Sequence, residues 1–302
     1  MYKILNFEIM ARVLIHVHVY YIKSWYKIEK CLKKIMADKS NEVKILTTVS
    51  ADIDDSDIYK IERTRVPNMS LIRVPNDGYD IQPFFLLLKE TPLEQYDYLV
   101  KLHTKNDVYG IDVVSNGRYI SRAQWSNFLM DAIASTPKTF KENIARMQSD
   151  STIGMIGSSY FISDVSSSDE EERRLIANFA DKLGADKVSE TQFVAGTMFM
   201  VRTGILKPLI DSGLVNEKFE RSESRKLGGT KAHAMERIFG ILVALNKKTM
   251  VGYDKSLWKD IITSSFAHAL RRFTFDKRIT SNGRVLIRIC RIPVWNFKYT
   301  KS

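Results

Sequence analysis

Residues 12–103 alternate between two hydrophobic patterns, and this alternation constrains the fold more than any other feature of the sequence. Short runs dense in β-branched residues predict strands that are buried on both faces. Segments with apolar residues at helical spacing lie between these runs and predict helices. The expected strands are 12–20, 42–50, 69–75 and 96–103, and the expected helices are 21–38, 54–65 and one that follows a turn at 76–80. Short connections between such elements predict an α/β fold with a mostly parallel central sheet.

The second half of the chain continues this pattern less regularly. Strands are expected at 152–160, 192–201 and 249–253, and helices at 121–135, 137–147, 203–214, 230–246 and from Glu170 onward. No convincing linker precedes residue 254 or so. We therefore expect one domain over residues 10–255 and a separate basic segment over residues 256–302.

Composition excludes several classes of protein. The 302 residues are 44% hydrophobic, which suits a soluble globular protein, and the longest apolar stretch, 13–22, is interrupted by His16 and His18. No run approaches the ~20 residues that cross a bilayer, and Glu8 and Arg12 interrupt any secretory signal. Two cysteines imply no disulfide framework and fit a reducing cytoplasm. The sequence also lacks a phosphate-binding P-loop, a dinucleotide fingerprint and a zinc-protease motif.

The positive charge is concentrated at the C-terminal end. The chain has a net charge of +11, of which residues 271–302, with nine basic residues and one acidic residue, account for +8. Basic and apolar residues alternate over 285–297, with Trp295 and Phe297 at the end, which suits an interfacial anchor on anionic lipid. A nucleic-acid-binding arm and a solvated helix or edge strand are the alternatives. We expect the anionic membrane surface to be the partner, and no nucleic acid.

Ligands of parallel α/β sheets bind beyond the carboxyl ends of the strands. His16 and His18 lie on one face of the first strand, where core histidines are the more common case. His18, nearer the strand's end, is the better pocket candidate. Asp52 belongs to an acidic cluster after the second strand, which could equally cap the next helix.

Four short segments stand out at such positions. They are Asn76-Asp-Gly-Tyr-Asp-Ile-Gln-Pro83, Lys101-Leu-His-Thr-Lys105, Ala195-Gly-Thr-Met-Phe199 and Ala232-His-Ala-Met-Glu-Arg237. The order of these segments and their residues resemble the rhamnan synthesis protein F family, bacterial glycosyltransferase-like proteins of cell-surface polysaccharide assembly. The resemblance covers about residues 70–245. Two positions depart from it: Tyr79 replaces an arginine, and Gly228 replaces an aspartate.

The resemblance implies a GT-A-like domain that binds a nucleotide-sugar donor. Many such domains hold a divalent metal against the donor diphosphate with an Asp-x-Asp motif, whereas this chain has His103-Thr-Lys105 at that place. A side-chain cation can also stabilise the negative charge of a leaving diphosphate. We expect Lys105 to do so, with His103 as a second donor and no metal. The alternative is that His103 caps the strand and Lys105 is solvated.

The resemblance also assigns a donor loop. In Asn76-Asp-Gly-Tyr-Asp80, Gly78 can adopt a positive φ and Asp80 can cap the following helix. A donor-binding role for Asn76, Gly78 and Asp80 competes with a purely structural turn. Asp52 would contact the nucleobase, and His18 would belong to the same donor site.

We expect the acceptor to bind at the last two of these segments, 195–199 and 232–237. Gly196 lets substrate approach the backbone, and Thr197 supplies a hydroxyl group. His233 and Glu236 share a helix face, and Arg237 lies one turn beyond His233. Glu236 is the first choice for the base that takes the acceptor's proton, with His233 orienting or replacing it. The alternative is an ion pair of Glu236 with Arg237 or Arg202 that holds the helix down.

These assignments predict a glycosyltransferase of polysaccharide biosynthesis, of the rhamnan or O-antigen type. It would transfer a sugar, L-rhamnose from its dTDP-activated form, to a lipid-linked or polysaccharide acceptor. Its location would be the cytoplasm, peripheral on the inner face of the cell membrane. The competing prediction is a non-catalytic scaffold or binding subunit of a polysaccharide assembly complex that retains the fold without turnover.

Overall fold

The structure is a computed structural model of the 302-residue chain. It describes residues 10–105, 112–115, 118–168, 170–185, 191–222, 229–253, 275–279, 284–290 and 292–298. Contacts divide the chain into two compact units, residues 1–107 with 126–255, and residues 108–125 with 256–302. All predicted site residues belong to the first unit.

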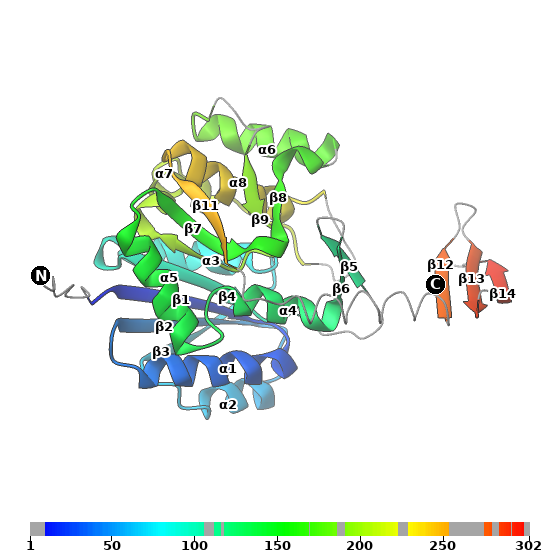
Figure 1. Cartoon of the computed structure of the whole chain (residues 1–302), viewed down its shortest axis with the longest axis horizontal. Coiled ribbons are helices and arrows are strands. Elements are labelled where there is room, and N and C mark those ends of the chain that lie inside the picture. Colours follow the sequence, from blue (N-terminus) through cyan, green and yellow to red (C-terminus); the bar gives the residue numbers. More distant parts are fainter. Residues whose placement is uncertain are drawn as a thin grey trace, which may run out of the picture. The chain divides into compact units, whose positions relative to one another are not determined.

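The first unit is built on a seven-stranded sheet with the order β11-β7-β10-β4-β1-β2-β3 (Figure 1). Its strands are β1 (Arg12–Val19), β2 (Glu42–Ser50), β3 (Met69–Val74), β4 (Tyr98–His103), β7 (Ile153–Ser158), β10 (Phe199–Arg202) and β11 (Thr249–Tyr253). Strand β10 runs antiparallel to both of its neighbours, and the other pairs are parallel. The predicted α/β class with a mostly parallel central sheet is confirmed.

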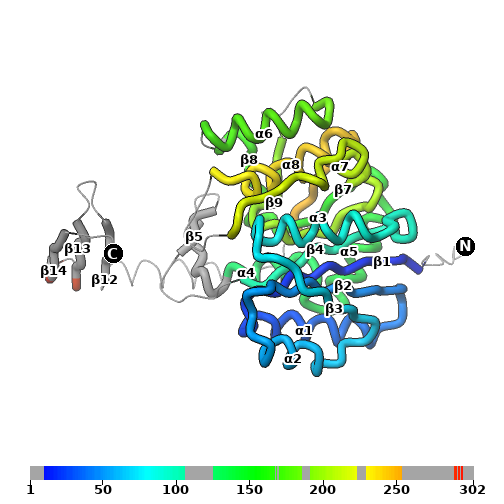
Figure 2. The backbone as a smooth tube through the Cα atoms, turned by 180° about the vertical axis from the view of Figure 1, so that it is seen from behind, coloured from blue at the N-terminus to red at the C-terminus, as the bar shows by residue number. Residues whose placement is uncertain are grey.

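Helices cover both faces of this sheet. The helices of the described residues are α1 (Ile22–Ala37), α2 (Asp55–Glu62), α3 (Ile81–Glu90), α4 (Arg122–Asp131), α5 (Pro137–Ser149), α6 (Glu170–Lys182), α7 (Lys207–Asp211) and α8 (Lys231–Leu245). Helices α1 and α2 lie on one face, and α3 and α8 lie on the other, as Figures 1 and 2 show from opposite sides. Helix α6 begins at Glu170, as the sequence predicts.

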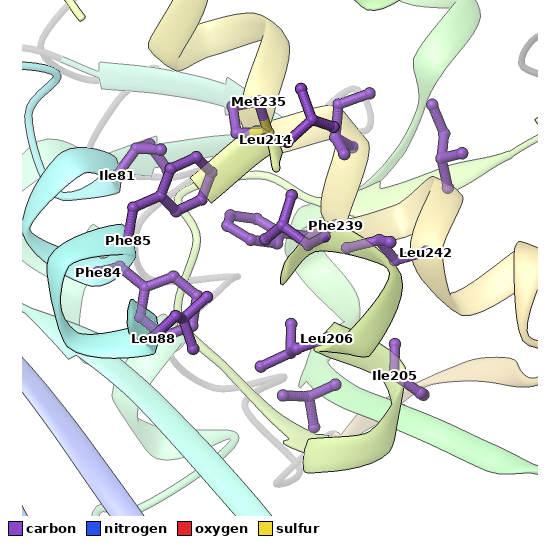
Figure 3. Close-up of a cluster of buried hydrophobic side chains, with 14 of the residues drawn as sticks. Ile81, Phe84, Phe85, Leu88, Ile205, Leu206, Leu214, Met235, Phe239 and Leu242 are labelled. Atoms are coloured by element: carbon purple, nitrogen blue, oxygen red, sulfur yellow. The ribbon is translucent and has the colours of Figure 1, made fainter. Parts of the chain in front are cut away.

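An aromatic core fixes α3 against α8. Phe84 of α3 lies edge-to-face against Phe239 of α8, with ring centroids 5.7 Å apart. Figure 3 shows Phe85, Met235 and Leu242 within the same buried cluster. Because aromatic side chains bury large apolar areas, this contact holds the first turn of α3 against the middle of α8. Asp80 directly precedes α3, and Glu236 lies on α8 one turn before Phe239, so the contact also fixes these predicted site residues.

The expected single strand over 192–201 is wrong. The chain forms β9 (Gln192–Val194), which pairs with β8 (Ile162–Asp164), and then β10 in the main sheet. The turn between them contains Gly196 with φ 89° and Thr197 with φ 47°. Both values are left-handed, and a strand cannot contain them. The expected helix over 203–214 is also shorter, because α7 ends at Asp211 and Gly213 has a left-handed φ of 74°.

The second unit contains two small antiparallel sheets. One pairs β5 (Asp112–Ser115) with β6 (Arg118–Ser121), and the other has the order β12-β13-β14. Its strands are β12 (Phe275–Ile279), β13 (Arg284–Ile289) and β14 (Ile292–Lys298). The basic segment 271–302 is therefore, where the structure describes it, a three-stranded sheet. None of the helices in the described part of the chain is long and apolar enough to cross a bilayer.

Candidate functional site

The four motif segments meet beyond the carboxyl end of β4. Asp80, which precedes α3, forms an ion pair with Lys101 of β4 and accepts a hydrogen bond from the Thr197 hydroxyl group. Glu236 of α8 accepts a hydrogen bond from the backbone N–H of Gly196. The turn between β9 and β10 is therefore held from two sides, by α3 and β4 on one and by α8 on the other.

Lys101 provides the charge at the centre of this arrangement. Its side chain is 0% exposed, and Nζ donates to Thr197 at Oγ1 (3.1 Å) and at the carbonyl oxygen (3.3 Å), in addition to Asp80. The ammonium group also lies 5.4 Å from the ring centroid of Phe84. A buried ammonium group without such partners would be strongly destabilising. Lys101 is not among the predicted site residues, although its position two residues before His103 places both side chains on one face of the strand.

The expected cap by Asp80 is not observed. Asp80 occupies the N-cap position of α3, but its side chain makes no capping hydrogen bond. The carboxylate instead faces Lys101 and Thr197, because the buried ammonium group needs an opposite charge. Burial opposes ionisation of Asp80, yet the surrounding His103, Lys101 and Lys105 hold the pKa of this carboxyl well below its usual range. Asp80 is therefore ionised at neutral pH.

Glu236 has both carboxylate oxygens in hydrogen bonds. Oε1 accepts from the Gly196 N–H, and Oε2 lies 2.7 Å from Nη1 of Arg237. The same Arg237 nitrogen lies 3.1 Å from the buried carboxylate of Glu172 on α6, and the guanidinium stacks 4.5 Å from the ring centroid of Phe193. This chain of contacts fixes the orientation of Glu236 from α6 through Arg237.

Of the two ion pairs considered for Glu236, the structure contains the one with Arg237. Arg202 lies elsewhere, where its guanidinium donates to the carbonyl oxygens of Ile153 (2.8 Å) and Asp150 (3.1 Å). These hydrogen bonds occupy the guanidinium N–H groups of Arg202 that an ion pair with Glu236 would need.

His233 lies at the start of α8 beside the donor loop. Its Nδ1 is 2.6 Å from the hydroxyl oxygen of Thr230, which also caps the helix by accepting from the His233 backbone N–H. The imidazole ring centroid lies 5.5 Å from that of Tyr79. Tyr79, one of the two departures from the family pattern, thus joins the first motif segment to the fourth. Gly228, the other departure, lies outside the described residues.

Asp52 and Asn76, both predicted donor-site residues, are brought together. The Asn76 side-chain amide donates to Asp52 (2.7 Å), and Arg221 forms an ion pair with the same carboxylate (3.2 Å). These groups follow β2 and β3 at the carboxyl edge of the sheet. Arg221 is a site residue that the sequence motifs do not indicate, because it comes from a segment with no recognisable pattern.

Residues 219–222, which we name the clasp segment, hold the donor loop in place. The Gly78 N–H donates to the carbonyl oxygen of Glu220 (2.9 Å), and the carbonyl oxygen of Asn76 accepts from the Ser222 N–H (2.9 Å). Gly78 has a φ of 59°, and a Cβ atom there would lie 2.6 Å from Cβ of Phe219. The glycine is therefore required both by its backbone conformation and by the clasp segment packed against it.

Histidines line the same face of the sheet as Lys101. The parallel register places His16 beside Lys101 and His18 beside His103. The Thr48 hydroxyl oxygen is 3.0 Å from Nε2 of His16 and 3.0 Å from Nδ1 of His18. Because a hydroxyl group has one hydrogen, it donates to one imidazole and accepts from the other.

These histidines are neutral at physiological pH. Burial lowers the pKa of His18 to about 4 and the pKa of His16 and His103 well below the ordinary value. His103 lies 3.5 Å from Asp80, whose charge opposes that shift without cancelling it. His103 can therefore supply an N–H donor to a ligand, but not a positive charge.

Lys105 lies two residues beyond β4 and is half-buried. Its carbonyl oxygen accepts a hydrogen bond from the Ser24 hydroxyl group of α1. The Thr104 hydroxyl oxygen accepts from the N–H groups of Tyr20 (2.8 Å) and Tyr21 (2.9 Å). The loop after β4 is thus tied to the loop after β1, and the Lys105 charge is close enough to lower the pKa of Asp80.

The described residues contain no group of three or more His, Cys, Asp and Glu side chains that could hold a metal ion. The expected independence of a divalent metal stays a prediction, because part of the chain lies outside the description.

Removing the charge of Lys101 is expected to destabilise the fold strongly. Lys101→Met leaves the buried Asp80 carboxylate without its cation, which costs about 3–5 kcal/mol of unfolding free energy. Adding Asp80→Asn removes the second charge, so the double variant should be more stable than the sum of the two single effects predicts. Urea unfolding measures both. The control is Lys60→Met, which breaks an exposed ion pair with Asp57 and should cost about 1 kcal/mol or less. A Lys101→Met variant as stable as this control would contradict the structural role of the ion pair.

Acidification should destabilise the protein through its buried histidines. Their pKa values are lowered from 6.5 in the folded state, to about 4 for His18, so the unfolded chain binds more protons between these values. The contribution of these histidines to the free energy of unfolding should be fully present above pH 6.5. It should decrease toward pH 4, by up to about 1.4 kcal/mol per pH unit for each histidine. Urea unfolding over this range tests it. His16→Gln, whose side-chain amide can still form a hydrogen bond with Thr48, should flatten the slope. An unaltered slope in His16→Gln would contradict this origin.

The chain is similar in sequence to two proteins of Xanthomonas campestris. A protein of Xanthomonas campestris pv. campestris strain B100, the uncharacterized protein WxcX, is 27% identical over 169 residues, which are 56% of this chain and 23% of that protein. The WxcX of strain ATCC 33913 matches to the same extent. The chain thus spans less than a quarter of these relatives.

Solved structures that resemble the chain include S. aureus TarS 1–349 in complex with UDP-GlcNAc. It is 13% identical, with a TM-score of 0.41 over 81% of this chain and 56% of that one. The mannosyltransferase PcManGT of Pyrobaculum calidifontis, in complex with GDP-Man and Mn²⁺, is 14% identical, with a TM-score of 0.38 over 87% and 65% of the two chains.

A family model described as rhamnan synthesis protein F matches residues 4–249. This range includes six of the seven strands of the central sheet and all four motif segments that converge beside β4. The match confirms the predicted resemblance: the chain belongs to the rhamnan synthesis protein F family.

Proposed function

We propose that the protein is a GT-A-like glycosyltransferase of bacterial cell-surface polysaccharide biosynthesis. Its donor would be a nucleotide sugar, dTDP-L-rhamnose in the first instance, and its acceptor a lipid-linked or growing polysaccharide. The observation that supports this best is the convergence of the four motif segments around Asp80, Lys101, Thr197 and Glu236. Family membership supports the same proposal.

The proposed donor site lies on the loops after β1–β4. Asp52 would contact the nucleobase, and Asn76 and Gly78 would shape the loop beside it, with His18 beneath. Lys105 would stabilise the charge on the leaving diphosphate. His103 would add a neutral N–H donor, since burial lowers the pKa of its imidazole.

The proposed acceptor side lies at α8 and the turn before β10. Glu236 would take the proton of the acceptor hydroxyl as the acceptor oxygen bonds to the anomeric carbon and the bond to the diphosphate breaks. Arg237 would hold Glu236 through their 2.7 Å contact. Gly196 and Thr197 would form the floor of the site, and His233 would flank it beside Tyr79.

One observation favours the second candidate, a non-catalytic scaffold or binding subunit. Both oxygens of Glu236 already accept hydrogen bonds, from Gly196 and from Arg237. Neither oxygen can therefore accept the proton of an acceptor hydroxyl group without sharing or releasing one of these hydrogen bonds. This role would need the fold and donor binding but no turnover.

Turnover distinguishes the two candidates. Purified protein incubated with a panel of nucleotide sugars should hydrolyse or transfer one of them, with or without EDTA. Glu236→Gln should lower kcat by at least about 100-fold with little change in donor affinity. Lys105→Ala should also lower kcat, and Glu171→Gln, which changes an exposed acid of α6, should not.

Binding of a donor without turnover across the panel would support the scaffold. Turnover that EDTA abolishes would overturn the proposal that Lys105 acts in place of a metal. PcManGT was solved with Mn²⁺, so this arm of the experiment is essential.

We further propose that residues 10–255 are the transferase domain, that 271–302 bind an anionic membrane surface, and that the protein is cytoplasmic and peripheral to the inner face of the membrane. The β13–β14 hairpin supports the membrane contact: Ile289 (45%), Ile292 (66%) and Val294 (45%) are exposed around its tip. Exposed apolar residues in a segment of charge +8 match the chemistry of an anionic lipid surface. No nucleic-acid partner is proposed.

Serine substitution at the hairpin tip tests this contact. Ile289→Ser with Ile292→Ser should reduce sedimentation with phosphatidylglycerol vesicles, and deletion of 271–302 should reduce it further, because each change removes apolar area or charge. Neither should alter nucleotide binding. The control is Ile72→Ser on β3, another isoleucine that is 53% exposed. Equal vesicle binding by the wild type and the deletion would refute the membrane role of this segment.

A further inference from the structure

The Asp80 carboxylate uses only one of its two oxygens within the protein. Lys101 Nζ, the Thr197 hydroxyl group and His103 Nδ1 (3.5 Å) all approach Oδ2. In the part of the chain that the structure describes, Oδ1 has no hydrogen-bond partner. The side chain is 17% exposed, in contrast to 0% for Lys101. The carboxylate therefore has a free acceptor oxygen within the described residues, on a side chain that is partly exposed.

This carboxylate is held in one orientation. It is fixed by β4 through Lys101, by the turn before β10 through Thr197, and by its own place at the first turn of α3. The first two of these contacts are charge-assisted or made by a hydroxyl donor, and both are largely buried. An acceptor fixed in advance gains affinity because little freedom is lost when a ligand binds.

The charges around Asp80 restrict what can bind to it. Lys101 balances the carboxylate, and the neighbouring His103 is neutral because burial lowers its pKa. A phosphate group beside Oδ1 would therefore meet a negative oxygen without a spare cation from Lys101 or His103. Hydroxyl groups, by contrast, donate to a carboxylate in strong charge-assisted hydrogen bonds. The chemistry that fits Oδ1 is an uncharged, hydroxyl-bearing part of a ligand.

We propose that Asp80 determines donor specificity by accepting a hydroxyl group of the transferred sugar at Oδ1, with Lys101 as the residue that positions it. This inference rests on the proposed function and narrows its donor class. The site takes nucleoside diphosphates of uncharged hexoses or deoxyhexoses and disfavours those of uronic acids, whose carboxylate would face Asp80. In this arrangement the diphosphate would contact Lys105, which follows β4.

Matched ligands test the proposal by calorimetric titration. UDP-glucose and UDP-glucuronic acid differ only in the oxidation of C6, and UDP, dTDP and dTDP-L-rhamnose separate the nucleotide from the sugar. The wild type should bind at least one uncharged nucleotide sugar about tenfold or more tightly than its nucleoside diphosphate. It should bind UDP-glucuronic acid at least about tenfold more weakly than UDP-glucose.

The variant that removes this acceptor is Asp80→Leu with Lys101→Met, because leucine has a shape close to that of aspartate and no oxygen. It eliminates both members of the buried pair, so no charge is left unpaired, and thermal unfolding verifies that it folds. It should keep the affinity for the nucleoside diphosphate, lose the increment from the sugar, and bind the two UDP-sugars equally. Asp54→Asn, an exposed carboxylate beyond β2 at the same edge of the sheet, should behave as the wild type.

The outcomes separate this proposal from the broader one. If the wild type binds none of the nucleoside diphosphates or nucleotide sugars, the glycosyltransferase proposal fails, and the role of Asp80 fails with it. If it binds nucleoside diphosphates but treats the uncharged and uronic sugars alike, the role of Asp80 is overturned while the glycosyltransferase proposal stands. The same holds if the double variant keeps the sugar increment.

Discussion

The ammonium group of Lys101 is fully buried beneath the carboxyl edge of the sheet, and its need for an opposite charge organises the elements around it. Asp80 supplies the charge, which draws the start of α3 over β4. Thr197 supplies a hydroxyl group and a carbonyl oxygen, which require the left-handed turn before β10. Without this cation the loop, the strand and the turn would have no common partner.

The regular elements of the first unit follow from local hydrophobic patterns, and most were predictable from the sequence. The strands and helices over 12–103 could be assigned because dense runs of β-branched residues differ from apolar residues at helical spacing. The pattern failed at 192–201, where a mostly apolar run resembles one strand with a glycine in its interior. The turn there depends on hydrogen bonds to Lys101 and Glu236, which are distant in the sequence.

The candidate site likewise has one part that the sequence predicts and another that depends on tertiary contacts. Asp80, His103, Thr197 and Glu236 could be found because each lies in a motif or at a strand end. The partner of each could not be found, since pairing is a property of tertiary structure. Arg221 lies in no motif. Lys101 does lie in a motif, but the sequence does not distinguish it from a lysine with an exposed side chain on a strand.

Because the clasp segment holds the donor loop, this loop can take its folded conformation only after residues 219–222 have been synthesised. The loop at 76–80 and its partners at 219–222 are about 140 residues apart, as in the contact between Tyr79 and Ser222. A growing polypeptide that has reached β4 has the sequence for four adjacent parallel strands, whose contacts are comparatively local. It has nothing to hold Gly78 in its left-handed conformation. Translation therefore reaches the partners of this loop only near the end of the first unit, which extends to residue 255.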